Sequence, residues 1–163
     1  MKPNQADIEA SFRSHHPKVL GYCVRMVGNR QTAEELVQDV FVAACSSAKD
    51  SEITKAWLFR CARNRCIDHL RRRGIWGRIK CLLTRDSIHE GVDEQVIERS
   101  VGLNILRKLP EKMRTALVLR SYAGLDYREL AEILEIQEAS VKVLLSRARK
   151  RACEMWSEEQ SSE

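Results

Sequence analysis

Apolar residues recur at helical spacing along nearly every long stretch of this 163-residue chain. In "TAEELVQDVFVAA" they occupy one face of a helix, at Ala33, Leu36, Val37, Val40, Phe41 and Ala44. The alternating pattern of a β-strand is nearly absent, and only three prolines and seven glycines interrupt the helical stretches. The sequence therefore predicts an all-α protein.

Helix signals in the first half of the chain predict four helices, over residues 7–15, 17–27, 33–47 and 54–73. Pro17 should separate the first two, and Gly74 should close the last. Thr32 and Glu35 have the spacing of a capping box at the start of the third helix.

The second half predicts a further group of helices. "PEKMRTALVLRSYA" has Pro110 in its first turn and Gly124 beyond its end, and "LDYRELAEILE" starts with a capping box of Asp126 and Glu129. We therefore expect two small helical domains, residues 1–74 and 95–163, joined by a linker over 75–94. Within the linker, Ile75, Ile79, Leu82 and Leu83 fit either a short docked helix or a membrane-surface segment.

The capped helix after Asp126, a short turn and the stretch "ASVKVLLSRARKR" together make a helix-turn-helix pattern. At roughly 100° per residue, one side of the last helix is an apolar stripe to be buried, consisting of Val141, Leu145, Ala148 and Ala152, with Leu144 on its flank. The opposite side, which we call the recognition face, consists of Ala139, Lys142, Val143, Ser146, Arg147 and Lys150. Small residues and cations on one helix suit the DNA major groove, so we predict DNA binding rather than a merely solvated cationic face.

A second basic surface lies on the helix predicted over 54–73. This arginine face consists of Trp57, Arg60, Arg63, Asn64 and Arg71. Arginines beside an aromatic ring suit contact with a DNA backbone and stacking on an unpaired base. A solvated face is the alternative. Arg65 falls among the apolar residues of this helix and should extend outward to solvent.

The helix over 33–47 instead carries an exposed acidic face, consisting of Glu34, Glu35, Gln38 and Asp39. The whole chain has a formal net charge of +5, so local acidity here favours docking on a positively charged protein surface. Ordinary solubilising charge is the alternative.

Three stretches in this order, "YCVRMVGNRQTAEELVQDVFVAA", "WLFRCARNRCIDHLRRR" and "LPEKMRTALVLRSYAGLDYRELAEILEIQEASVKVLLSRARKRA", resemble the extracytoplasmic-function (ECF) sigma factors of bacterial RNA polymerase. The resemblance implies that Glu35, Gln38 and Asp39 bind core polymerase. It also implies that the arginine face binds the −10 promoter element, that the recognition face binds the −35 element, and that an anti-sigma factor is a possible partner.

The chain departs from the family pattern in its helix-turn-helix. Glu135 stands where the family usually has Gly, and Gln137 stands where it usually has a Ser- or Thr-like cap. Val143 and Leu144 replace polar residues. We expect Glu135 to take an ordinary turn conformation with negative φ, so that the fold survives. These departures leave the base preference at −35 open.

We expect the six cysteines to be mainly small, reduced core residues: Cys23, Cys45, Cys61, Cys66, Cys81 and Cys153. Arginines near Cys61 and Cys66 leave a redox role open. Cys61 and His69 are too far apart along one helix to share a zinc ion with Cys66, so we expect no metal or cofactor.

No nucleophile with a base and no phosphate loop appears in the sequence, so an enzyme is not predicted. The absence of a long apolar segment predicts a cytoplasmic protein without membrane insertion. A helix-turn-helix regulator that binds DNA without polymerase remains the alternative function.

Overall fold

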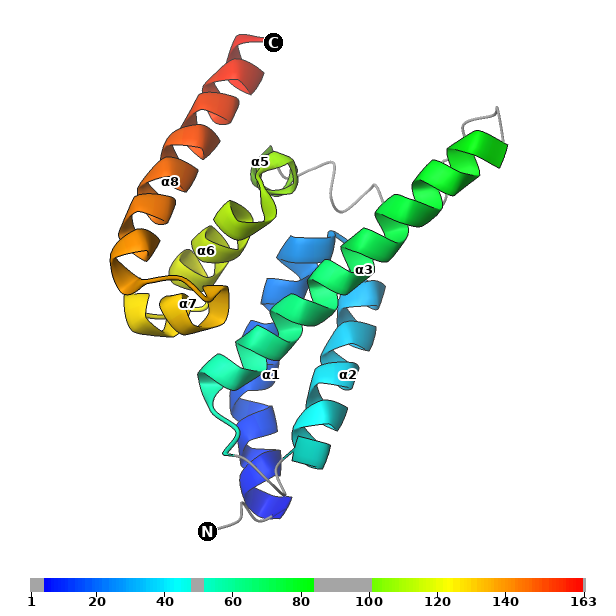
Figure 1. Ribbon diagram of the computed structural model, residues 1–163, viewed down its shortest axis with the longest axis vertical. Coiled ribbons are helices and arrows are strands. Elements are labelled where there is room, and N and C mark those ends of the chain that lie inside the picture. Colours follow the sequence, from blue (N-terminus) through cyan, green and yellow to red (C-terminus); the bar gives the residue numbers. More distant parts are fainter. Residues whose placement is uncertain (1–4, 48–51, 84–100, 163) are drawn as a thin grey trace.

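The computed structural model describes residues 5–47, 52–83 and 101–162, and these residues form helices and no strand (Figure 1). The all-α prediction is confirmed. The helices are α1 Gln5–Val27, α2 Arg30–Ser47, α3 Lys55–Leu83, α5 Val101–Lys108, α6 Glu111–Ser121, α7 Tyr127–Leu134 and α8 Glu138–Ser161. Within the described ranges, no helix combines the length and the apolar content needed to cross a membrane.

Helices α1, α2 and α3 pack on one another in an N-terminal bundle. The predicted break at Pro17 is wrong, because α1 continues through it as one helix. A proline inside a helix removes a backbone hydrogen bond and costs about 3 kcal/mol. Burial of Val19, Tyr22 and Cys23 on the following turns offsets that cost.

The start of α2 differs from the prediction. Asn29 caps the helix, because its Oδ1 accepts a hydrogen bond from the Thr32 backbone N–H at 2.9 Å. The predicted capping box of Thr32 and Glu35 is therefore wrong, since Thr32 already lies inside α2. The predicted apolar stripe is confirmed, with Leu36 half-buried and the other five residues buried.

Gly74 does not close α3, which continues to Leu83. An interior glycine costs a helix only about 1 kcal/mol, which is too little to end it without a competing turn. The first part of the predicted linker is thus helical backbone. The side chains of Ile75, Ile79, Leu82 and Leu83, and all of residues 84–94, lie outside the described residues. The domain boundaries stay a prediction.

The C-terminal group matches its predicted signals closely. Pro110 precedes α6 as its N-cap, and Gly124 has the positive φ of 70° that a helix stop favours. At α7, Glu129 N–H donates to Asp126 Oδ1 at 2.8 Å, and Asp126 N–H donates to Glu129 Oε2 at 2.9 Å. The second capping box is confirmed.

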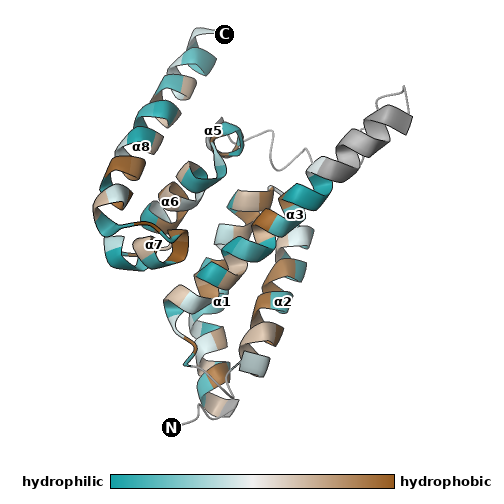
Figure 2. Ribbon diagram, viewed as in Figure 1, coloured by the Kyte–Doolittle hydropathy of each residue, from teal (hydrophilic) through white to brown (hydrophobic). Residues whose placement is uncertain are grey.

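Helix α8 is mostly hydrophilic along its length (Figure 2). Its apolar stripe nevertheless packs on α6 and α7, where Val141, Leu145 and Ala148 are fully buried. Ala152 and Leu144 are half-buried. The predicted buried stripe is confirmed.

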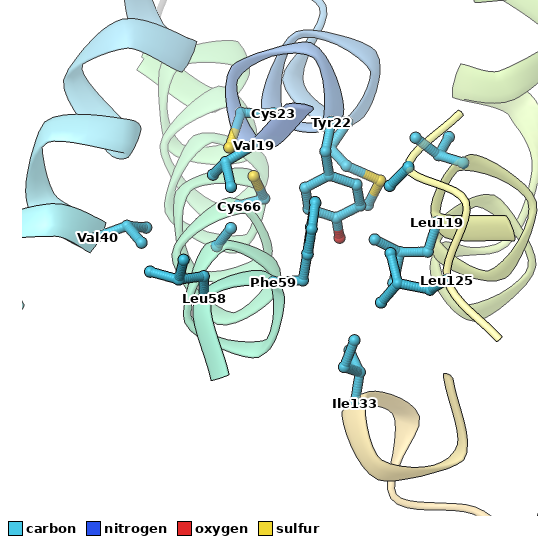
Figure 3. Close-up of a cluster of buried hydrophobic side chains, with 14 of the residues drawn as sticks. Val19, Tyr22, Cys23, Val40, Leu58, Phe59, Cys66, Leu119, Leu125 and Ile133 are labelled. Atoms are coloured by element: carbon cyan, nitrogen blue, oxygen red, sulfur yellow. The ribbon is translucent and has the colours of Figure 1, made fainter. Parts of the chain in front are cut away.

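The two groups of helices share one apolar core. The rings of Tyr22 in α1 and Phe59 in α3 meet edge to face, with centroids 6.0 Å apart. Leu119, Leu125 and Ile133 approach them from the C-terminal group (Figure 3). A buried guanidinium adds a polar link, because Arg114 of α6 donates to the Met26 carbonyl at the end of α1 at 3.0 Å.

Leu145→Asp should unfold the C-terminal helices. The Leu145 side chain has no solvent exposure, and an unpaired charge buried there costs about 3–5 kcal/mol, much of a typical folding free energy. Urea denaturation followed by circular dichroism measures the loss. Val143→Asp is the matched control, because Val143 is 50% exposed on the same helix and should keep a near-native midpoint. Equal midpoints for the two variants would contradict the assigned stripe.

Candidate nucleic-acid interface

The recognition face lies open on α8. All six residues predicted for it are exposed, whereas the apolar stripe on the other side of the helix is buried against α6 and α7. The face therefore presents small side chains in the first turn of α8 and three cations farther along. This arrangement lets a helix approach a nucleic-acid groove closely while its cations reach phosphates.

A residue that the sequence analysis missed joins this face. Exposed Lys112 of α6 lies with Ala139, Val143 and Arg147 around a shallow groove at the start of α8. Sequence spacing along α8 carried no signal for it, since Lys112 belongs to another helix. Its position adds a fourth cation to the surface.

The turn of the helix-turn-helix holds Glu135 in an unexpected conformation. Its φ of 56° and ψ of 43° lie in the left-handed region, so the predicted negative φ is wrong. Ile136 N–H donates to the Ala131 carbonyl and Glu135 N–H to the Glu132 carbonyl, which is the Schellman pattern that favours Gly at this position. A side chain in this conformation costs about 1 kcal/mol, so the tertiary contacts of Glu135 must offset strain.

The arginine face on α3 is only partly exposed. Arg60, Asn64 and Arg71 are exposed and Trp57 is half-buried, whereas only 11% of the Arg63 side chain is accessible. The prediction that Arg63 lies on an open surface is wrong for this structure. Helix α7 packs on α3, and the start of α6 reaches the same place.

Acidic groups of the C-terminal helices bind two of these arginines. Arg63 donates to both carboxylate oxygens of Glu111, at 3.0 and 3.3 Å, and to the Ile133 carbonyl near the end of α7 at 3.3 Å. One turn earlier, Arg60 Nη2 donates to Glu135 Oε1 at 2.6 Å. We call Glu111 and Glu135 the acidic clasp.

The two ion pairs of the acidic clasp differ in solvent exposure and therefore in strength. The Arg60–Glu135 side chains are 47% and 66% accessible, so that pair contributes about 0–1 kcal/mol. The Arg63–Glu111 pair is bidentate and better shielded from water, and it also faces the negative end of the α7 dipole. Arg63 is therefore the more firmly held of the two.

The acidic face of α2 is open. Glu34, Glu35, Gln38 and Asp39 are all exposed, with Glu34 paired to Arg30 within the helix at 3.0 Å. Arg65 extends outward as predicted, and its Nη1 lies 3.8 Å from Asp39 Oδ2. This surface is available to a cationic partner.

The cysteines divide by position. Cys23 and Cys66 are fully buried in the N-terminal core, as predicted, and the structure places them side by side (Figure 3). Cys61 is half-buried, whereas Cys45 and Cys153 are exposed, so the core prediction is wrong for those two. The side chain of Cys81 lies outside the described residues.

The environment of the buried thiols opposes redox chemistry. The hydrogen bond with Cys23, together with burial, raises the pKa of Cys66, and burial raises the pKa of Cys61 despite the nearby Arg65. A raised pKa leaves little of the reactive thiolate at neutral pH. In the part of the chain that the structure describes, no three His, Cys, Asp or Glu side chains gather as a metal site would require.

Both halves of the chain match models of known protein families. Sigma-70 region 2 matches residues 11–75, and Sigma-70, region 4, matches residues 103–151. RNA polymerase sigma factor YlaC of Bacillus subtilis is 31% identical, over 87% of this chain and 87% of that protein. ECF RNA polymerase sigma factor SigM of the same organism is 30% identical, over 88% of this chain and 91% of its own.

Solved structures share the fold. The sigma factor RpoE bound to the anti-sigma factor NepR from Bartonella quintana superposes with a TM-score of 0.75 at 24% identity, covering 93% of this chain and 97% of that one. CnrH in complex with the cytosolic domain of CnrY gives 0.74 at 21% identity, covering 94% and 90%.

Alkylation of the native protein at neutral pH should label Cys45 and Cys153 rapidly, because both are exposed. Cys61 should react slowly, since burial raises its pKa, and its labelling should speed up as pH rises toward that pKa. Cys23 and Cys66 should stay unlabelled until urea unfolds the chain. Peptide mass spectrometry measures each site, and rapid labelling of Cys66 in the native protein would contradict its burial.

Proposed function

The chain belongs to the ECF sigma factors, and on this basis we propose that it binds core RNA polymerase and directs promoter recognition and transcription initiation. One observation carries the proposal: Sigma-70 regions 2 and 4 match the two halves in order, and each half presents a charged face. The negative charge of the acidic face suits a basic polymerase surface, and the positive charge of the other two faces suits DNA.

The −35 element is assigned to the recognition face. Lys142 and Arg147 can donate to guanine edges or phosphates, Ser146 can bond a base or phosphate, and Val143 can contact a thymine methyl. The exposure of all three polar residues supports this role. Lys112 of α6, which lines the same groove, can add a phosphate contact.

The −10 element is assigned to the arginine face. Trp57 provides a ring for stacking on an unpaired base, and Asn64 and Arg71 are exposed on the same helix. Arg60 and Arg63 supply further backbone contacts when the acidic clasp is released.

Core polymerase is assigned to the acidic face of α2. Glu35, Gln38 and Asp39 lie exposed on adjacent turns, on the side of the helix away from its buried stripe. Their negative charge in a chain of net charge +5 suits a basic partner surface rather than DNA.

A DNA-binding regulator that works without polymerase explains fewer observations. It would use α7 and α8 and leave both the acidic face and the match to region 2 without a role. We assign no catalytic step to the chain, because polymerisation chemistry belongs to the polymerase. It would act in the cytoplasm, where polymerase and promoter are found. An anti-sigma factor would control it, which fits the similarity to RpoE in complex with the anti-sigma factor NepR.

Transcription reconstituted from core polymerase, the purified chain and genomic DNA tests this function. We expect discrete start sites that require the chain. Asp39→Lys reverses one charge of the acidic face and should abolish both core binding and initiation while leaving −35 duplex binding intact. Glu9→Lys on exposed α1 is the charge-matched control and should initiate normally. Absence of every start site with the folded wild-type chain would refute the function.

Arg147→Ala should weaken binding to a −35 duplex about tenfold, because a good base contact contributes about 1–3 kcal/mol. Fluorescence anisotropy measures the affinity at fixed salt. Circular dichroism should show unchanged helix content, since the Arg147 side chain lies on the exposed face. Arg13→Ala removes the same charge from distant α1 and should bind almost normally. Equal affinities for the two variants would remove Arg147 from the interface.

A further inference from the structure

We propose that the free chain is self-inhibited, with the acidic clasp occupying Arg60 and Arg63 so that the two groups of helices must part before the arginine face takes promoter DNA. The inference rests on the proposed role of that face. It concerns contacts between the two halves of this chain alone, and it requires no anti-sigma factor.

The carboxylates of the acidic clasp bind the two arginines as the phosphates of DNA would. Glu111 binds Arg63 through two parallel hydrogen bonds, which is the geometry that guanidinium groups also form with phosphate. The Ile133 carbonyl completes the partners of Arg63, and Glu135 takes Arg60 one turn earlier. An incoming DNA strand therefore competes with carboxylates for the same donors.

The clasp also blocks access. Helix α7 packs directly on α3, and only 11% of the Arg63 side chain remains accessible. A nucleic-acid backbone cannot contact Arg63 while α6 and α7 occupy this position. By contrast, the recognition face and the acidic face are both open in the same structure. Closure thus withholds one binding surface and leaves the other two available.

The ion pair between Arg60 and Glu135 is accompanied by backbone strain at Glu135. The residue keeps the left-handed conformation that favours Gly, with φ of 56°, and its carboxylate reaches Arg60 from there. A glycine would relieve the backbone strain but would have no carboxylate to offer. The side chain at this position therefore serves the contact between the two halves rather than the turn.

A second contact, which contains no ion pair, also holds the two halves together. Tyr122, after α6, lies flat against α1, where its hydroxyl donates to the Pro17 carbonyl at 3.4 Å and its ring faces the Arg25 guanidinium at 3.8 Å. Gly21 makes this approach possible, because a Cβ there would lie 2.0 Å from the Tyr122 hydroxyl oxygen. Substitution of Gly21 should therefore loosen closure without changing any charge.

The test measures affinity of the full-length chain for a fluorescein-labelled single strand carrying a −10 sequence. Only the open fraction binds the strand with the whole arginine face, so the apparent affinity rises with that fraction. Glu111→Gln combined with Glu135→Gln should tighten binding about tenfold. Glu132→Gln plus Glu138→Gln removes the same charge from exposed positions outside the clasp and should tighten it less than about twofold.

Gly21→Ala separates opening from net charge. Alanine favours the helix and keeps the charge constant, yet it displaces Tyr122, so binding of the single strand should again tighten. Equal affinities for the clasp variant and its charge-matched control would overturn the proposal. A gain in the clasp variant without any gain in Gly21→Ala would also overturn it, because release of the two arginines without parting of the halves would then explain the effect. Failure of the proposed function is distinguished by the absence of initiation with core polymerase in every variant.

Discussion

The buried rings of Tyr22 and Phe59, both in the N-terminal bundle, form the surface on which the C-terminal helices pack. Both rings are fully buried, and apolar side chains from α6, α7 and the turn before α7 close over them. Because this core is shared, the position of the C-terminal helices on the N-terminal bundle determines which charged surfaces remain open. The acidic face of α2 and the recognition face of α8 are exposed, whereas the arginine face is partly covered.

The distribution of charge explains how one small protein can serve two kinds of partner. Carboxylates on α2 suit a basic protein surface, and cations on α3 and α8 suit DNA. The same complementarity operates inside the chain, since Glu111 pairs with Arg63 and Glu135 pairs with Arg60. Intramolecular and intermolecular binding thus use one set of donors, and neither can be strengthened without affecting the other.

Much of this structure follows from local sequence. Helical periodicity predicted the buried stripes of α2 and α8, and the capping box at Asp126 located α7, because these features depend on residues a few positions apart. Pro17 and Gly74 misled the prediction, since the helices α1 and α3 continue through both. The burial of Arg63 could not be predicted, because it depends on packing between distant segments. The left-handed Glu135 is a local feature of the end of α7, and the Gly that the family usually has at this position was the signal for it.

The central claim is that the free chain is closed and opens when it joins polymerase and promoter. Exposed Cys45 in α2 and exposed Cys153 in α8 allow spin labels on the two halves, with Cys61 and Cys81 replaced by serine. Pulsed electron paramagnetic resonance then measures the distance between the labels. The account predicts one narrow, short distribution for the free chain and a longer distance in the complex with core polymerase and promoter DNA. The same distribution in both states would contradict it.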